Sequence, residues 1–200
     1  MFVQVIKGKT SDPKGLRRRM DEWRDSVRPN VAGYLGGTAG VNDDGTFVVF
    51  ARFADEAAAA ANNARPEQQQ WFEGTRALFD GEPTFRESSD VSLLFDGGAD
   101  DAGFVQVMEG TVTDRAKVEA LETPEMISQL RAARPDLLGS LRVWFDDGSY
   151  AEAAYFTSED DARKGESSAD FSSPQQEYMS LFPDMTFTDL PSPQLTGPNS

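Results

Sequence analysis

Two glutamines interrupt otherwise apolar segments at matching places in the sequence. Gln4 lies in FVQVIKG, and Gln106 lies in FVQVMEG much later in the chain. A polar amide in an apolar strand could hold a small molecule in an apolar pocket. The alternative is structural: each amide bonds across the interface between two sheets, because buried polar groups are nearly always hydrogen bonded.

Two further pairs of side chains are candidates for ligand contacts. Arg52 in FVVFARF and Tyr155 in YAEAAYF occupy equivalent places. They either reach a ligand or lie near strand ends with their polar heads in water. Trp71 and Trp144 are either walls for an aromatic ligand or members of the core.

Arg142 and Glu152 flank a turn rich in aspartate and glycine. If this turn has three residues, Asp146 to Gly148, the two side chains lie directly opposite each other and can pair. With a two-residue turn, Glu152 faces Val143 instead. Glu152 is therefore a candidate general base, and the alternative is an ion pair at the surface or rim.

The composition excludes several kinds of chemistry. The chain has no cysteine and no histidine, so it has no disulfide, no thiol nucleophile, and no histidine ligand for haem or zinc. A site for magnesium or calcium made of carboxylates alone stays open, but the sequence has no EF-hand loop. We expect no cofactor and no metal site. The formal net charge of −15 repels phosphate backbones, so we expect no nucleic-acid partner. The absence of a long apolar run predicts no membrane span, and the polar N-terminus predicts a cytoplasmic protein.

The sequence pattern of the elements that position these residues occurs twice in the chain. After the two glutamine strands, each half reaches an Arg-Pro segment, RPNVAGYL at Arg28–Leu35 and RPDLLGSL at Arg134–Leu141. An Asp-Asp-Gly turn follows between apolar runs, which is typical of a β-hairpin. The glycine-rich segment at Gly33–Gly40 indicates an irregular or bulged strand. Asp55 and Ser158 then occupy the positions of helix N-caps.

The two halves therefore read as a tandem duplication of one unit. The order strand, helix, strand, strand, helix, strand predicts a ferredoxin-like α+β unit, a four-stranded antiparallel sheet with both helices on one face. Both faces of each strand are apolar, so the open face of each sheet needs a cover. We expect the two antiparallel sheets to pack face to face as an intrachain α/β barrel with the helices outside.

The predicted organisation has four parts. Residues 1–96 form the first ferredoxin-like repeat, 97–103 a linker, 104–191 the second repeat, and 192–200 a disordered tail. The chain would then be a monomer with an internal pseudo-dimer, or a weak homodimer.

The chain resembles the dimeric α/β-barrel superfamily, in its antibiotic-biosynthesis-monooxygenase-like branch, as a fused tandem pair. The segments that carry the resemblance are the FVQV strands, the Arg-Pro segments, the Asp-Asp-Gly hairpins and RFADEAAAAANNARPEQQQWF at Arg52–Phe72. The RPEQQQW stretch resembles an uncharacterised family of two-repeat bacterial proteins. Haem-degrading members of the superfamily need a helix histidine, which this chain lacks.

The resemblance leaves two functions open. In the first, a small apolar or aromatic molecule binds between the sheets, and the protein is a cofactor-independent monooxygenase. Because oxygenases of this branch carry an amide on their first strand, the resemblance implies a role for Gln4 and Gln106. In the second, the protein is non-catalytic, structural or stress-related, with a filled barrel.

Overall fold

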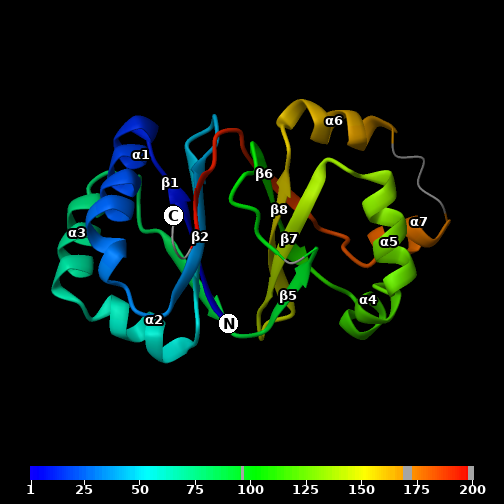
Figure 1. The fold of residues 1–200 in the computed structure, drawn as a ribbon, viewed down its shortest axis with the longest axis horizontal. Coiled ribbons are helices and arrows are strands. Elements are labelled where there is room, and N and C mark those ends of the chain that lie inside the picture. Colours follow the sequence, from blue (N-terminus) through cyan, green and yellow to red (C-terminus); the bar gives the residue numbers. More distant parts are fainter. Residues whose placement is uncertain (96, 169–172, 198–200) are drawn as a thin grey trace. The chain divides into compact units, whose positions relative to one another are not determined.

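A computed structural model of the chain describes residues 1–95, 97–168 and 173–197. The chain divides into two compact units. The first unit comprises Met1–Val91 together with Leu190–Ser200, and the second comprises Ser92–Asp189. Each unit contains one five-stranded sheet and the helices that belong to it (Figure 1).

The first unit is an antiparallel sheet with the strand order β10-β2-β3-β1-β4. Its helices cover one face of this sheet (Figure 1). A helical segment between β1 and β2 has three parts, α1 and the short turns η1 and η2, and a second segment between β3 and β4 consists of α2 and α3. The elements are β1 (Phe2–Lys9), α1 (Pro13–Glu22), η1 (Trp23–Val27), η2 (Arg28–Asn30), β2 (Tyr34–Val41), β3 (Thr46–Phe53), α2 (Glu56–Asn63), α3 (Pro66–Arg76), β4 (Thr84–Ser88) and β10 (Gln194–Thr196).

The second unit repeats this arrangement with the strand order β5-β7-β8-β6-β9. The central pairs β6–β8 and β7–β8 are antiparallel. The elements are β5 (Val91–Leu94), β6 (Phe104–Thr111), α4 (Arg115–Leu121), α5 (Pro124–Ala133), β7 (Leu137–Trp144), β8 (Ser149–Phe156), α6 (Glu159–Ser168), α7 (Ser173–Met179) and β9 (Thr186–Leu190).

The local signals of the duplication are confirmed. Both second strands carry a register shift at their start, next to Gly36 in β2 and next to Gly139 in β7. The Asp55 carboxylate accepts a hydrogen bond from the Ala58 backbone N–H at 2.8 Å, and Ser158 Oγ accepts one from the backbone N–H three residues later at 3.2 Å. These caps satisfy backbone donors that a helix start leaves unpaired.

Two predicted segments differ from the structure, because in each of them the chain leaves one sheet and adds a strand to the other. The last strand of the first repeat was predicted as one element, but β4 belongs to the first sheet and β5 to the second. The second sheet therefore begins before the predicted start of the second repeat at residue 104. Residues 192–200 were predicted to be disordered, whereas β10 pairs with β2 over Gln194–Thr196. Residues 198–200 lie outside the described part of the chain. The face-to-face packing of the sheets stays a prediction.

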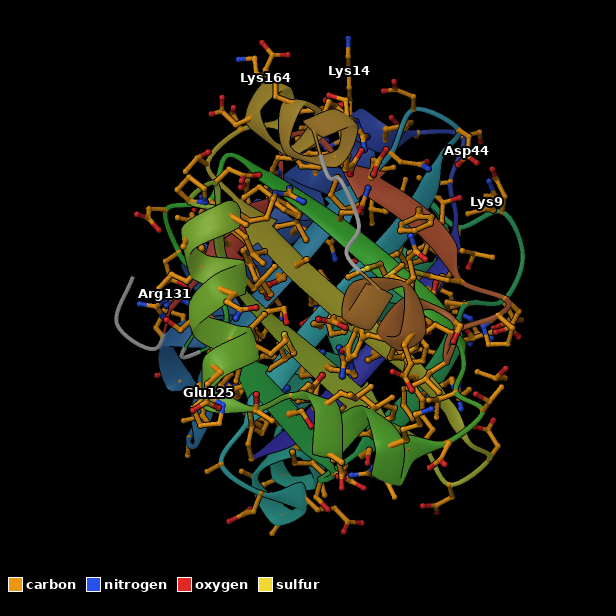
Figure 2. The ribbon with its side chains drawn as sticks, turned by 90° about the vertical axis from the view of Figure 1, so that its right-hand side faces the viewer. Lys9, Lys14, Asp44, Glu125, Arg131 and Lys164 are labelled. Carbon is orange, nitrogen blue, oxygen red and sulfur yellow. The ribbon has the colours of Figure 1, made fainter. Side chains whose placement is uncertain are left out.

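Charged side chains project outward from the helices and loops (Figure 2). Lys9 and Asp44, both labelled there, form an exposed ion pair at 2.9 Å. Hydrogen bonds from the Thr46 hydroxyl and from Lys9 lower the pKa of Asp44 below its usual range. No helix in residues 1–95, 97–168 and 173–197 is long and apolar enough to cross a membrane.

Candidate functional site

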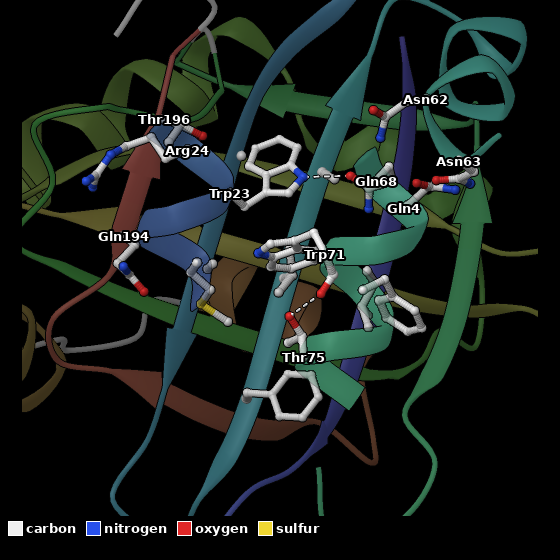
Figure 3. A pocket seen from close by; sticks show the side chains of 18 of the residues that line it. Gln4, Trp23, Arg24, Asn62, Asn63, Gln68, Trp71, Thr75, Gln194 and Thr196 are labelled. Atoms are coloured by element: carbon white, nitrogen blue, oxygen red, sulfur yellow. Dashed lines mark hydrogen bonds between the residues drawn. The ribbon is translucent and has the colours of Figure 1, made fainter. Parts of the chain in front are cut away.

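The first unit has a partly open cavity of about 320 Å³ between its sheet and its helices (Figure 3). The sheet supplies one wall and the helices α1, η1 and α3 supply the other. The strand residues of the wall include Gln4, Ile6, Ala39, Val49 and Ala51. On β3, Val49 and Ala51 line the cavity and are only partly buried, whereas their neighbours Val48 and Phe50 are fully buried.

The cavity exists because the strand wall is built from small residues. In register, Ala39 on β2 lies opposite Val49 on β3, and Ala51 lies opposite Gln4 on β1. Gly37 also lines the wall, and a Cβ atom there would lie 2.4 Å from the Tyr34 hydroxyl oxygen. Glycine at this position leaves the room that the Tyr34 side chain needs.

Two tryptophans form the helical wall, and their indole groups are held in place. Trp23 on η1 donates a hydrogen bond from Nε1 to Gln68 Oε1 at 2.7 Å (Figure 3). Trp71 on α3 donates from Nε1 to the Arg19 carbonyl oxygen at 2.7 Å. The two rings meet edge to face with centroids 6.4 Å apart. Because both indole donors are engaged with the protein, the tryptophans present apolar ring surface to the cavity.

Several polar side chains of the wall are hydrogen bonded within the first unit. Gln4 Nε2 donates to Glu87 Oε2 on β4 at 3.0 Å. The Tyr34 and Thr196 hydroxyl oxygens lie 2.7 Å apart. Gln4 therefore bonds to the adjacent strand of its own sheet, which corrects the interpretation that its amide bonds between two sheets.

The cavity wall carries almost no charge. Among the described residues that line it, Arg24 is the one with a formal charge at neutral pH. A side-chain hydrogen bond to Asp25 and the nearby Asp21 raise the pKa of Arg24, so its guanidinium stays cationic. The described part of the wall contains no carboxylate, and the chain contains no histidine. The site therefore suits an uncharged aromatic molecule better than an ionic one.

The second unit has a buried ionic network at the matching strand positions. Arg142 on β7 lies directly opposite Glu152 on β8, as Ala39 lies opposite Val49 in the first unit. The turn between them spans Asp146 to Gly148, as the three-residue alternative required. Both side chains are at least nine-tenths buried, so the predicted surface or rim pair is wrong. Glu152 Oε2 accepts a hydrogen bond from Arg142 Nε at 2.7 Å.

Helix residues complete this network. Arg142 donates to Glu122 at 2.8 Å and to the Tyr178 hydroxyl at 2.9 Å, and Tyr178 donates in turn to Glu122 at 2.6 Å. Burial lowers the pKa of Arg142, but attraction to Glu152 and to Glu122 outweighs this and raises it overall. Burial also raises the pKa of Tyr178. Arg142 thus stays charged and Tyr178 stays neutral at physiological pH.

The other predicted site residues lie away from the cavity. Arg52 and Tyr155 are buried and lie opposite Val3 and Val105, on the sheet faces turned away from the helices, so the prediction of heads in water is wrong. Trp144 belongs to the core of the second unit and donates from Nε1 to Ser92 Oγ at 2.9 Å.

Gln106, the residue equivalent to Gln4, is hydrogen bonded within its own unit. Its Nε2 donates to Asp189 at 3.1 Å and to Glu166 at 3.3 Å, both within the second unit. Of the eight predicted residues, the cavity wall contains Gln4 and Trp71. It also contains residues that were not predicted as site residues, namely Trp23, Tyr34, Gln68, Gln194 and Thr196. Gln68 and Trp71 lie one helical turn apart, so their spacing could have placed both side chains on one face of a helix. Gln194 and Thr196 lie in the segment that was predicted to be disordered.

No protein-family model matches the sequence, and no curated protein matches it. Solved structures do match over nearly the whole chain. A "putative monooxygenase" from Lactobacillus acidophilus is 11% identical with a TM-score of 0.72, covering 98% of this chain and 96% of its own. A "putative monooxygenase" from Fusobacterium nucleatum is 11% identical with a TM-score of 0.74, covering 98% and 94%.

An "anthrone oxidase-like protein" is 11% identical with a TM-score of 0.67, covering 100% of this chain and 94% of its own. At this level of identity the likeness concerns the fold and not the chemistry. It confirms the fold that the resemblance implied. The chain is two ferredoxin-like repeats in one polypeptide, with the fold of these monooxygenase-named proteins.

Proposed function

We propose that the first repeat binds a small, uncharged, mostly apolar aromatic molecule in its helix–sheet cavity. The observation that carries this proposal is the cavity of about 320 Å³ with two fixed tryptophans on its wall. Ligand pockets in proteins usually enclose roughly 300–1,000 Å³ and are lined mainly by apolar and aromatic groups. This site differs from the predicted one, because it lies beneath the helices of one repeat and not between the sheets.

The charge of the wall selects among aromatic molecules. A cationic ligand would lie near Arg24 with no carboxylate on the described part of the wall to balance it. Burying an unpaired charge is strongly unfavourable, whereas a neutral ring loses little on leaving water. The alternative of a filled, non-catalytic interior fits the first repeat less well, because small side chains leave its strand wall open.

Tryptophan fluorescence tests this proposal directly. The chain has three tryptophans, and Trp144→Phe leaves Trp23 and Trp71, both on the cavity wall. We expect 1-naphthol to quench the fluorescence of this variant saturably. We expect 1-naphthylmethylamine, which has a similar ring and a positive charge at neutral pH, to bind at least roughly tenfold more weakly. Equal affinity for both probes, or no saturable quenching by either, would contradict the proposal.

Oxidation by molecular oxygen is a second candidate function. It is supported by the names of the structural neighbours, which include an anthrone oxidase-like protein. An anthrone-type substrate needs no reductant from the protein: its methylene group and one O₂ give a carbonyl group and one water. The described wall offers no carboxylate or histidine as a base, so the lining residues support binding more directly than proton abstraction.

Oxygen uptake distinguishes the two functions. If the protein is an oxygenase, anthrone should be converted to anthraquinone with one O₂ consumed per molecule, at a rate proportional to protein concentration. The rate should fall on competition with 1-naphthol, because both compounds would occupy the same cavity. If oxygen is consumed no faster than in buffer while 1-naphthol still binds, the oxygenase function is contradicted and the binding function stands.

A further inference from the structure

One buried polar atom on the cavity wall has no hydrogen-bond partner among the described residues. Gln194 lies on β10 and lines the cavity, and its side-chain Oε1 is buried and accepts no hydrogen bond from residues 1–95, 97–168 or 173–197. Its Nε2 donates to Asp21 Oδ1 at 2.8 Å and to the Arg17 carbonyl oxygen at 3.2 Å, both on α1. These two acceptors fix the orientation of the amide, because turning it over would set Oε1 against two other oxygens.

Gln194 lies on the face of its sheet that lines the cavity. Gln194 lies opposite Ala39 in the β10–β2 ladder, on the side of the sheet that faces the helices. Figure 3 shows Gln194 on β10 at the edge of the cavity. Two other wall amides are already engaged as acceptors: Gln68 Oε1 receives the Trp23 indole N–H, and Asn62 Oδ1 receives an N–H of the Arg65 guanidinium. An unmet acceptor beside an apolar cavity is an unusual feature, because buried polar groups are nearly always bonded.

We propose that Gln194 Oε1 accepts a hydrogen bond from an O–H or N–H group of the ligand and so selects hydroxyaromatic or aminoaromatic molecules over ethers and hydrocarbons. This inference rests on the function proposed above and specifies the ligand class. The selecting residue comes from the end of the chain, beyond the second repeat, and completes the first repeat's site. A donor buried beside Gln194 gains a partner, whereas a donor buried in an apolar cavity without one is penalised.

A pair of probes tests the inference. 1-Naphthol carries a donor, and 1-methoxynaphthalene has the same rings without one. In the Trp144→Phe background, we expect the preference for 1-naphthol over 1-methoxynaphthalene to fall roughly tenfold in Gln194→Met, a nearly isosteric change that removes the acceptor. The ratio of the two affinities is the readout, because any loosening of β10 weakens both probes together.

Leu195→Ala is the matched control on the same strand. Successive side chains point to opposite faces, so this change shortens a side chain of β10 without touching the acceptor. We expect the ratio to stay at the parent value in this variant. An unchanged ratio in Gln194→Met, with both probes bound, would overturn the role of Gln194 and leave the proposed function standing.

The remaining outcomes also decide between the ideas. If neither probe binds the parent protein, the proposed function fails and the inference with it. If Gln194→Met does not fold, the parent protein alone gives the answer. Without an acceptor the cavity should favour 1-methoxynaphthalene, whose oxygen needs no partner. Binding of 1-naphthol at least as tight as that of the ether supports the inference, and a tenfold preference for the ether overturns it.

Discussion

Replacing Arg142 by alanine is expected to lower the free energy of unfolding by about 3–5 kcal/mol, because it leaves a buried carboxylate without its partner. The side chain of Glu152 is only 8% exposed, and its Oε2 atom lies 2.7 Å from Arg142 Nε. Glu122 would lose a second bond from the same guanidinium. Urea unfolding followed by circular dichroism measures this loss. If the two repeats unfold in separate transitions, the transition of the second repeat should shift to lower urea concentration.

Arg115→Ala is a matched control for this variant. Arg115 also lies over the Trp144 ring and also pairs with a glutamate, Glu119 at 2.8 Å. Its side chain is 38% exposed, against 10% for Arg142. Exposed ion pairs contribute about 0–1 kcal/mol, so we expect a small effect. Similar losses in both variants would show that the loss depends on the ring contact and not on the buried charge.

The first repeat indicates which second substitution should restore the stability lost in Arg142→Ala. It has alanine and valine, Ala39 and Val49, at the ladder positions of Arg142 and Glu152. Arg142→Ala combined with Glu152→Val should therefore recover most of the lost stability, because replacing both charges by apolar groups removes the unpaired carboxylate. A double variant less stable than Arg142→Ala alone would contradict this account of the network.

The duplication and its hairpins could be predicted because their signals are local. Repeated apolar strands, Asp-Asp-Gly turns and the cap residues Asp55 and Ser158 each specify structure within a few residues. The three-residue turn ending at Gly148, which has a φ of 80°, placed Arg142 opposite Glu152. Their burial could not be predicted, because the residues that complete the network, Glu122 and Tyr178, come from distant helices.

The location of the cavity could not be predicted, for two physical reasons. Alternation along β1 separates Gln4 from Val3, but it does not say which of the two faces meets the helices. The ligand was therefore expected between the sheets, whereas the cavity of the first unit lies beneath α1 and α3. In addition, β10 forms by pairing with a strand far away in the sequence. A short segment with three prolines around it carries no periodic signal for such pairing, so Gln194 and Thr196 were assigned to a tail.

Filling the cavity should affect ligand binding and stability in opposite directions. Ala51 lines the cavity on β3, and we expect Ala51→Phe to lower the affinity for 1-naphthol at least roughly tenfold, because the new ring occupies the ligand's space. The same ring leaves water and packs against the wall, so the free energy of unfolding should rise by about 1 kcal/mol. Fluorescence titration and urea unfolding measure the two effects.

Ala154→Phe is the matched control in the second repeat. Ala154 lies opposite Gln106, as Ala51 lies opposite Gln4. It is 3% exposed and packs in a core cluster with Phe104 and Phe156. A phenylalanine there has no void to fill, and overpacking a close-packed core lowers stability by about 1–3 kcal/mol. We expect Ala154→Phe to destabilise the protein and to leave 1-naphthol binding to the folded protein unchanged.

The comparison of these two alanines tests the asymmetry between the repeats. Duplicated units keep the same backbone, so a difference in what one position tolerates reflects the side chains around it. Equal destabilisation by the two substitutions would mean that Ala51 lies against a packed interior. That result, with undiminished binding of 1-naphthol in Ala51→Phe, would place the ligand outside the cavity.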